Sequence, residues 1–150
     1  MNNIPRFGKR DEGQTYRERP GAYGVGFDER GRIGVVFNGS GNGFLPGGGI
    51  DPQKSPEQAL RREVIEECGF EISLQGKIGE ALEYFQSIFS DKFFKTHGHY
   101  YEIRFEKFVG GVIEDDHQLV WLNPAEAVQK LHRDAQAWIV KQAFQNPHNS

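Results

Sequence analysis

The chain of 150 residues has one cysteine, one methionine and no long uninterrupted apolar segment. The single cysteine, Cys68, cannot form a disulfide within the chain, and its place at a predicted helix end favours a packing role. No apolar run approaches the roughly 20 residues that a membrane-spanning helix needs. The polar start, residues 1–6, lacks the apolar segment of a signal peptide. These absences predict a cytoplasmic protein that spans no membrane.

The chain also lacks a strong excess of charge of one sign. Its net charge is −3 and its pI is near 6.0, which argues against broad electrostatic binding to nucleic acid. A hydrophobic content of 37% is enough for one substantial core, and nothing suggests a second. We therefore predict a polar N-terminal arm over residues 1–19, a single domain over residues 20–146 and a short tail over residues 147–150.

Three glutamates, Glu63, Glu66 and Glu67, lie close together within a predicted helix. A helix turns by about 100° per residue, so the three carboxylates fall within an arc of roughly 100°. Like charges three or four residues apart each destabilise a helix by about 0.2–0.5 kcal/mol, and the last turn disfavours anions. A divalent cation that prefers oxygen ligands would reverse each of these effects. Charge runs are usually solvated surfaces, so further evidence is needed for a metal site.

The ends of this acidic helix are marked by local signals. Ser55 is a suitable N-cap, Pro56 suits the first helical position, and Gln58 can complete a capping box. Gly69 tolerates the left-handed conformation that ends many helices. These residues predict a helix from about residue 56 to Cys68.

Three consecutive glycines, Gly47, Gly48 and Gly49, precede the acidic helix. Glycine lets the backbone approach a ligand closely because no side chain stands in the way. A glycine loop that leads into an acidic helix suits a phosphate bridged by a metal ion. We therefore expect these three glycines to contact a phosphate-bearing substrate.

The combined pattern resembles the signature of the Nudix hydrolases. That signature is Gly, five residues, Glu, seven residues, then Arg-Glu-U-x-Glu-Glu-x-Gly-U, where U is a bulky apolar residue. Gly48 opens it here, and the run from Arg62 to Phe70 closes it at the required spacing. Two positions depart from the pattern, since Lys54 replaces the first glutamate and Phe70 replaces the usual aliphatic residue.

The resemblance implies a role for each residue of the acidic helix. Glu63 and Glu67 would be the main ligands of a Mg²⁺ or Mn²⁺ ion, with Glu66 assisting and the backbone carbonyl of Gly48 as a further ligand. Arg62 would brace the glutamates, because a guanidinium beside three carboxylates reduces their repulsion and fixes their rotamers. The replacement of the first glutamate by Lys54 would then affect the reaction rate or the number of bound metal ions more than the presence of activity.

A second acidic cluster, Glu114, Asp115 and Asp116, lies just before Trp121. Nudix enzymes often carry an acidic residue outside the signature, in the loop before a strand with tryptophan, that binds metal or reads the substrate base. The resemblance therefore implies such a role for one of the three acids, and a plain solvated loop is an equally good interpretation. Glu102 is a further candidate for the extra ligand.

Two histidines, His97 and His99, flank Gly98. On a strand they would point to the same face, as a metal pair does, but the sequence shows no third ligand. We interpret them as structural or adjacent to the substrate. Several aromatic residues nearby could stack on a nucleobase, although most are expected in the core.

Periodicity and turn signals predict a mixed architecture without internal repeats. Strand-like segments come first, one helix lies in the middle and two helices lie near the end, which favours an α+β fold with a sheet between helices. The resemblance implies an α/β/α sandwich with a mixed sheet. The predicted strands are residues 21–27, 33–37, 70–74, 77–85, about 101–106 and 118–122, and the later helices are about 124–131 and 133–144.

Two functions of different classes fit the sequence. The first is metal-dependent hydrolysis of a pyrophosphate bond in a nucleoside diphosphate linked to another moiety, such as a nucleoside triphosphate, a nucleotide sugar or a dinucleoside polyphosphate. The second is a catalytically weak nucleotide-binding sensor, for which Lys54 is the only indication. The retained residues of the acidic helix favour the enzyme. Specificity would come from residues of about 70–120, from the N-terminal arm or from the second subunit of a homodimer.

Overall fold

The computed structural model describes residues 3–87, 90–110 and 116–145. In chain order its elements are β1 (Arg6–Phe7), β2 (Tyr16–Gly26), β3 (Ile33–Phe37), β4 (Gly43–Phe44), β5 (Gly47–Gly49), α1 (Pro56–Cys68), β6 (Phe70–Gln86), β7 (Phe93–Phe108), β8 (Gln118–Leu122), α2 (Pro124–Lys130) and α3 (Asp134–Gln145).

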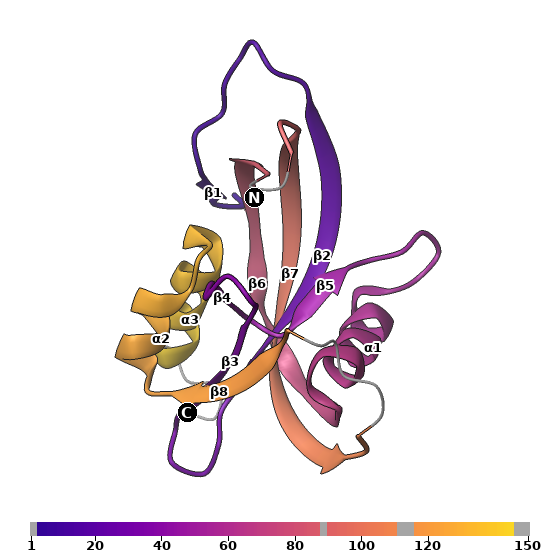
Figure 1. The fold of residues 1–150 in the computed structure, drawn as a ribbon, viewed down its shortest axis with the longest axis vertical. Coiled ribbons are helices and arrows are strands. Elements are labelled where there is room, and N and C mark those ends of the chain that lie inside the picture. Colours follow the sequence, from indigo (N-terminus) through magenta and orange to yellow (C-terminus); the bar gives the residue numbers. More distant parts are fainter. Residues whose placement is uncertain (1–2, 88–89, 111–115, 146–150) are drawn as a thin grey trace.

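The strands form two sheets (Figure 1). A five-stranded sheet has the order β1-β6-β7-β2-β5, and a three-stranded sheet has the order β4-β3-β8. The larger sheet is mixed, because β1 pairs with β6 and β2 with β7 in parallel, while the β6–β7 and β2–β5 pairs are antiparallel. The long β6 and β7 run side by side through its centre.

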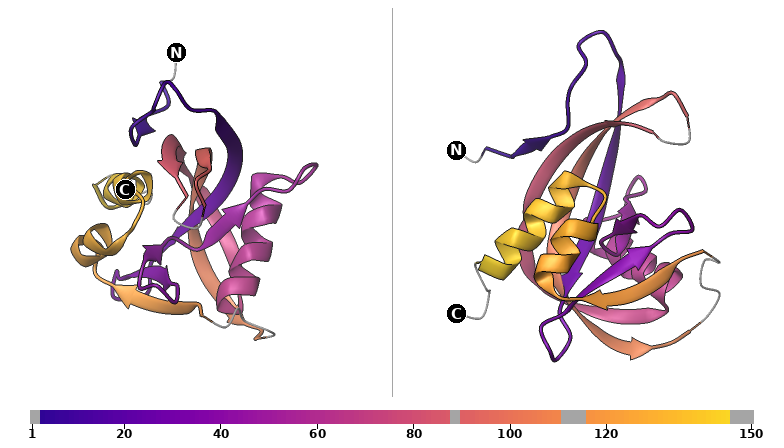
Figure 2. Two further views of the ribbon diagram at one scale, coloured as in Figure 1. Left: turned by 45° about the horizontal axis from the view of Figure 1, so that its top comes forward. Right: turned by 60° about the vertical axis from the view of Figure 1, so that its left-hand side comes forward.

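The helices cover opposite faces of the strands, with α1 on one side and α2 and α3 on the other (Figure 2). The alternation of side chains along β7 produces this division. Tyr100 is buried in a cluster with Ile139 and Val140 of α3, whereas its neighbour Tyr101 is buried in a cluster with Leu60 and Val64 of α1. This arrangement confirms the predicted α+β sandwich.

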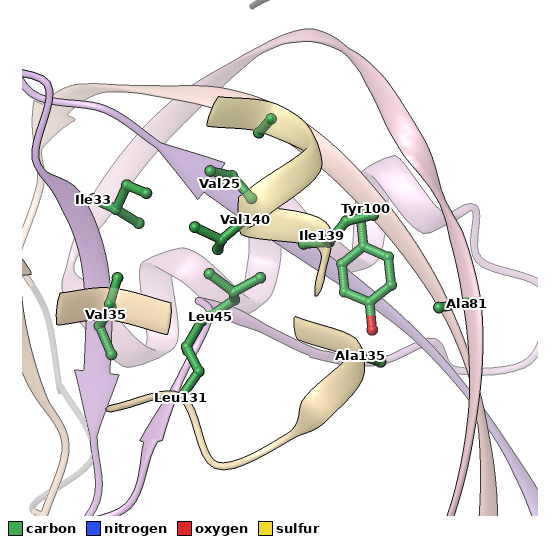
Figure 3. Close-up of a cluster of buried hydrophobic side chains, with 12 residues drawn as sticks. Val25, Ile33, Val35, Leu45, Ala81, Tyr100, Leu131, Ala135, Ile139 and Val140 are labelled. Atoms are coloured by element: carbon green, nitrogen blue, oxygen red, sulfur yellow. The ribbon is translucent and has the colours of Figure 1, made fainter. Parts of the chain in front are cut away.

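The cluster beside α2 and α3 is the larger core (Figure 3). Val25 and Val35 from the two sheets meet Leu45, Ile139 and Val140, and none of these side chains exposes more than 1% of its surface. Full burial of such an aliphatic side chain contributes about 1.5–3 kcal/mol. The core therefore fixes the sheets and the two C-terminal helices relative to one another.

The capping signals of α1 act as predicted. The N–H of Gln58 donates to the Ser55 hydroxyl at 3.1 Å, and the Gln58 side chain accepts from the Ser55 N–H at 2.9 Å. At the other end Gly69 has φ of 77°, and its N–H donates to the Ile65 carbonyl. The acidic helix accordingly occupies Pro56–Cys68, as the sequence indicates. Cys68 is buried and burial raises the pKa of its thiol to about 12, as a packing role requires.

The N-terminal region is more structured than its polar composition predicts. β2 begins at Tyr16, so residues 16–19 belong to the sheet rather than to an arm. Their backbone pairs with β7, which requires no apolar side chains. Earlier in the chain, β1 pairs with β6 and Phe7 packs on Trp138 at 5.7 Å between ring centres. Residues within the predicted polar arm therefore form strands of the sheet, and Phe7 packs against the larger core.

A second difference concerns β6. The sequence predicts two strands separated near Gln75, but the structure has one strand over Phe70–Gln86. Irregularities in its pairing with β7 lie between Leu74 and Gly76 and between Lys77 and Gly79. Such bulges bend a strand without ending it, which explains why the local pattern looked interrupted.

Candidate active site

The glycine strand β5 and the acidic helix α1 are joined by a direct hydrogen bond. The backbone N–H of Gly47 donates to Oε1 of Glu67 at 2.9 Å. Gly47 has φ of 141°, and a Cβ there would lie 2.1 Å from the carbonyl oxygen of Ala22. Only glycine can therefore occupy this position without moving β2.

Gly48 lies against the first glutamate of the helix. A Cβ on Gly48 would lie 2.6 Å from Oε1 of Glu63 and 2.7 Å from its carboxyl carbon. The carboxylate thus occupies the space that a side chain at position 48 would fill. Gly48 pairs with Ala22 of β2, so the strand that carries it is held by the main sheet.

Arg62 contacts three carboxylates. Its guanidinium lies 2.6 Å from Asp51, 3.0 Å from Glu63 and 3.8 Å from Glu66. The hydrogen bonds to Asp51 and Glu63 raise the pKa of Arg62, so the guanidinium stays charged. This geometry is what a bracing role requires, and that role stays a prediction.

Asp51 is a member of this network that the sequence did not reveal. It lies in the turn between β5 and α1, and its carboxylate makes the shortest of the Arg62 contacts. Lys54, which replaces the signature's first glutamate, is exposed in the same turn. Asp51 therefore supplies an acidic partner for Arg62 three residues before the position where the signature has its first glutamate.

The donor set at this site suits a hard divalent cation. Glu63 and Glu67 both lie against β5, and Glu66 lies on the same helix with a half-exposed side chain. Carboxylate and carbonyl oxygens are the ligands that Mg²⁺ and Mn²⁺ prefer. Arg62 offsets only part of the negative charge, so Glu63, Glu66, Glu67 and the Gly48 carbonyl are the residues that could hold the ion.

A cleft of about 350 Å³ opens beside the glycine strand. Glu67 and β5 form one part of its wall. The other walls come from β2, from the end of β6 and the start of β7, and from the region where α3 begins. The residues that line these walls include Arg19, Tyr23, Phe85, Phe94, Tyr100, Arg133 and Gln136. The acidic helix and the interior of the domain thus share one concave surface.

Two arginines in the cleft stack on two aromatic rings. The guanidinium of Arg133 lies 3.6 Å from the ring centre of Phe85, and that of Arg19 lies 4.1 Å from the ring centre of Phe94. The two rings are 5.8 Å apart. The cations and the flat apolar rings therefore form one row. The rings can stack on the face of a ligand, and the guanidinium groups can donate hydrogen bonds to its acceptor atoms.

Tyr23 lies between the acidic and basic parts of the cleft. Burial, followed by the nearby charge of Glu67, raises the pKa of its phenol to about 12, while Arg133 and Arg19 act in the opposite direction. The hydroxyl therefore remains a hydrogen-bond donor at neutral pH. Its ring stacks on Tyr100 at 5.6 Å, which fixes its orientation.

Glu83 is a buried acid in the same cleft. It accepts hydrogen bonds from the backbone N–H groups of Asp134 and Ala135, so it caps the start of α3. Burial raises its pKa, and the charge of Arg133 opposes that shift. The sequence alone did not reveal Glu83, because its hydrogen-bond partners lie at the start of a helix distant in the chain.

The second acidic cluster is only partly described. Glu114 and Asp115 lie outside the described residues, and Asp116 is exposed in the turn before β8. Asp116 lies 3.3 Å from His117, which lines the cleft, but Asp116 does not line it. Glu102 lines a different hollow, beside Phe27 and Trp121. A role for any of these acids stays a prediction.

Comparison with known proteins decides the family. The protein-family model of the NUDIX domain matches residues 17–143 of this chain. The chain belongs to the Nudix family. A protein of Bacillus subtilis strain 168 named as a candidate 8-oxo-dGTP diphosphatase is 51% identical over 35 residues, a match that covers 23% of this chain and 24% of that protein.

Solved Nudix structures share the fold. A NUDIX hydrolase from Nitrosomonas europaea superposes with a TM-score of 0.70 at 14% identity, covering 86% of this chain and 90% of that one. A MutT protein from Methanosarcina mazei Go1 superposes with a TM-score of 0.63 at 18% identity, covering 88% of this chain and 97% of that one. At these identities the likeness establishes the architecture and leaves the substrate open.

Among the described residues, none of the helices combines the length and the apolar composition needed to cross a membrane.

Proposed function

We propose that this Nudix protein hydrolyses a pyrophosphate bond in a nucleoside diphosphate linked to another moiety, with the aid of Mg²⁺ or Mn²⁺. The observation that carries the proposal is the position of Glu67. Its carboxylate accepts the hydrogen bond from Gly47 and also forms part of the cleft wall. A ligand in the cleft would therefore bring its phosphates to the acidic helix.

A divalent ion at this helix would neutralise charge on the diphosphate and lower the pKa of a bound water. The chain's own residues provide the setting. Gly47 orients Glu67, and Arg62 orients Glu63 and Glu66. The absence of side chains on β5 leaves room for phosphate oxygens beside the carboxylates. Glu63, or an acidic residue outside the helix, would accept the proton of the attacking water.

The nucleoside would occupy the part of the cleft lined by Phe85 and Phe94. Flat apolar rings stack on nucleobases, and stacking of this kind contributes about 1–3 kcal/mol per base. Arg19 and Arg133 can donate hydrogen bonds to acceptor atoms of the base or the sugar. Tyr23, between this region and Glu67, would contact the segment that links nucleoside and phosphates.

The Bacillus subtilis relative makes nucleoside triphosphates the first substrates to test. Purified protein with Mg²⁺ or Mn²⁺ should be incubated with a panel of deoxynucleoside triphosphates, oxidised nucleotides, nucleotide sugars and dinucleoside polyphosphates. Release of a nucleoside monophosphate from at least one class supports the enzyme, and Glu67→Gln should greatly slow that release. Tight nucleotide binding without any product would instead support the sensor.

A control is needed to separate loss of the site from loss of the fold. Glu57 is exposed in the first turn of α1, at the opposite end of the helix from Glu67. Glu57→Gln removes the same charge from the same helix and should retain wild-type turnover. A comparable loss in both variants would show that α1 responds to any change of charge, which would remove the support for a specific role of Glu67.

A further inference from the structure

The two histidines of β7 face a carboxylate from the neighbouring strand. The rings of His97 and His99 stack nearly parallel, 4.7 Å apart, which confirms that they share one face of the sheet. Glu80 of β6 lies directly opposite His99 in the antiparallel pairing. Its Oε1 is 2.6 Å from Nε2 of His97 and its Oε2 is 4.0 Å from Nδ1 of His99. Glu80 is thus a third potential ligand beside His97 and His99, and the sequence did not reveal it.

We propose that Glu80, His97 and His99 form a second metal site, for a zinc ion, separate from the site of hydrolysis. One ligand atom from each residue lies within 4.8 Å of the other two. Two imidazoles and one carboxylate are a typical zinc donor set, with Zn–N and Zn–O distances of about 2.0–2.2 Å. Small rotations of the side chains would bring the three atoms to such a centre, with a fourth position open to water.

The donor set distinguishes this site from the acidic helix. Mg²⁺ prefers oxygen ligands, whereas imidazole nitrogen suits zinc and its neighbours in the transition series. The cluster also lies on the face of β7 opposite to the cleft. His99 precedes Tyr100, which lines the cleft, and successive side chains on a strand point to opposite faces. None of Glu80, His97 and His99 is among the residues that line the cleft.

A positive group already lies at this cluster. The ammonium of Lys77 is 2.8 Å from Oε2 of Glu80 and 3.3 Å from Nδ1 of His99. The Lys77 side chain is 41% exposed, so it can move into solvent when an ion binds.

Ligation would join the two central strands close to the irregularity between Lys77 and Gly79. Metal that binds only the folded state adds to its stability in proportion to the logarithm of the metal concentration. The site would therefore act as a clamp between β6 and β7. This role does not depend on whether the proposed hydrolysis is correct.

The test is zinc titration by calorimetry on protein without a histidine tag, in millimolar Mg²⁺ to occupy the acidic helix. We expect one site with a dissociation constant in the micromolar range or tighter. His97→Gln, His99→Gln and Glu80→Gln should each weaken it by at least about tenfold. His132→Gln, a matched loss of a histidine elsewhere, should leave zinc affinity unchanged. Lys77→Met should tighten binding, because it removes the competing ammonium.

Two results would overturn the proposal. One is zinc affinity in the histidine variants equal to that of the wild type. The other is a zinc site that disappears in Glu67→Gln, which would place the ion at the acidic helix. A shift of the melting temperature gives an independent measurement: zinc should raise it in the wild type and in Glu67→Gln, but not in His99→Gln.

Discussion

The 2.9 Å hydrogen bond from the N–H of Gly47 to Oε1 of Glu67 connects the glycine strand to the last turn of the acidic helix. It satisfies a backbone donor of β5 and fixes the orientation of a carboxylate that faces the cleft. The glycines and the glutamates of the signature are therefore one structural unit, and changes to either should affect the other.

The first prediction concerns the charge of Glu67. In Glu67→Gln the side-chain oxygen can still accept from Gly47, so the fold should persist while the negative charge is lost. We expect kcat to fall by at least about two orders of magnitude, equivalent to roughly 2.7 kcal/mol of activation free energy. Steady-state kinetics and a thermal melt of each variant measure the two effects separately. Near-normal turnover would remove Glu67 from the metal site.

The second prediction concerns Gly48→Ala. The added methyl group would lie 2.6 Å from Oε1 of Glu63, so the carboxylate must move. Because the obstacle is the end of a flexible side chain, we expect a melting temperature near that of the wild type and a loss of activity of about tenfold or more.

Gly49→Ala provides the comparison for this variant. The nearest atom to a Cβ there is 3.9 Å away, so the methyl group fits and leaves Glu63 in place. Any effect of Gly49→Ala must then arise at the cleft wall. If Gly48→Ala were as active as the wild type, the position of Glu63 would not matter to the reaction.

Local signals account for the parts of the site that the sequence predicted. The bounds of α1 follow from Ser55, Gln58 and Gly69, which act within a few residues of themselves. The spacing of the glutamates then fixes their shared face. Such features depend on neighbouring residues only, so they can be interpreted without knowledge of the fold.

The parts that were missed depend on pairing between distant segments. Glu80 meets His99 only because the bulges of β6 set its register against β7. Glu83 meets α3 because the sheet brings residues 83 and 134 together. The turn before α1 folds back so that Asp51 reaches Arg62. No periodicity in the sequence encodes these approaches.

The third prediction tests Asp51. The pair with Arg62 is exposed, with side-chain exposures of 60% and 42%, so it should contribute at most about 1 kcal/mol to stability. Its effect on turnover should be larger, because Arg62 also orients Glu63. We expect Asp51→Asn to lower kcat about three- to tenfold with a nearly unchanged melting temperature. A double-mutant cycle with Arg62→Gln should show coupling, and strictly additive effects would contradict the bracing role.

The fourth prediction concerns acid stability at the turn after β2. Desolvation alone would raise the pKa of Asp28, but hydrogen bonds from Arg32 and Arg30 outweigh it and hold the pKa below 3.8. A carboxyl whose pKa is lower in the folded state than in the unfolded state stabilises the protein at pH values above its unfolded-state pKa. This stabilisation is lost as the pH falls through the folded-state pKa. The wild type should therefore lose more stability than Asp28→Asn below about pH 4. Denaturant melts at several pH values measure this, with Glu29→Gln as the control.

The fifth prediction tests the proposed nucleoside end of the cleft. Arg133 stacks on Phe85 and is partly desolvated, which lowers the pKa of its guanidinium. Arg133→Gln would remove the proposed contact to the nucleoside, which lies away from the acidic helix, so we expect KM to rise about tenfold while kcat changes little. Steady-state kinetics on the best substrate of the panel should be compared with Arg104→Gln, an exposed arginine on β7 outside the cleft. A fall in kcat at constant KM would instead place Arg133 at the reacting phosphates, and equal kinetics in both variants would place the nucleoside elsewhere.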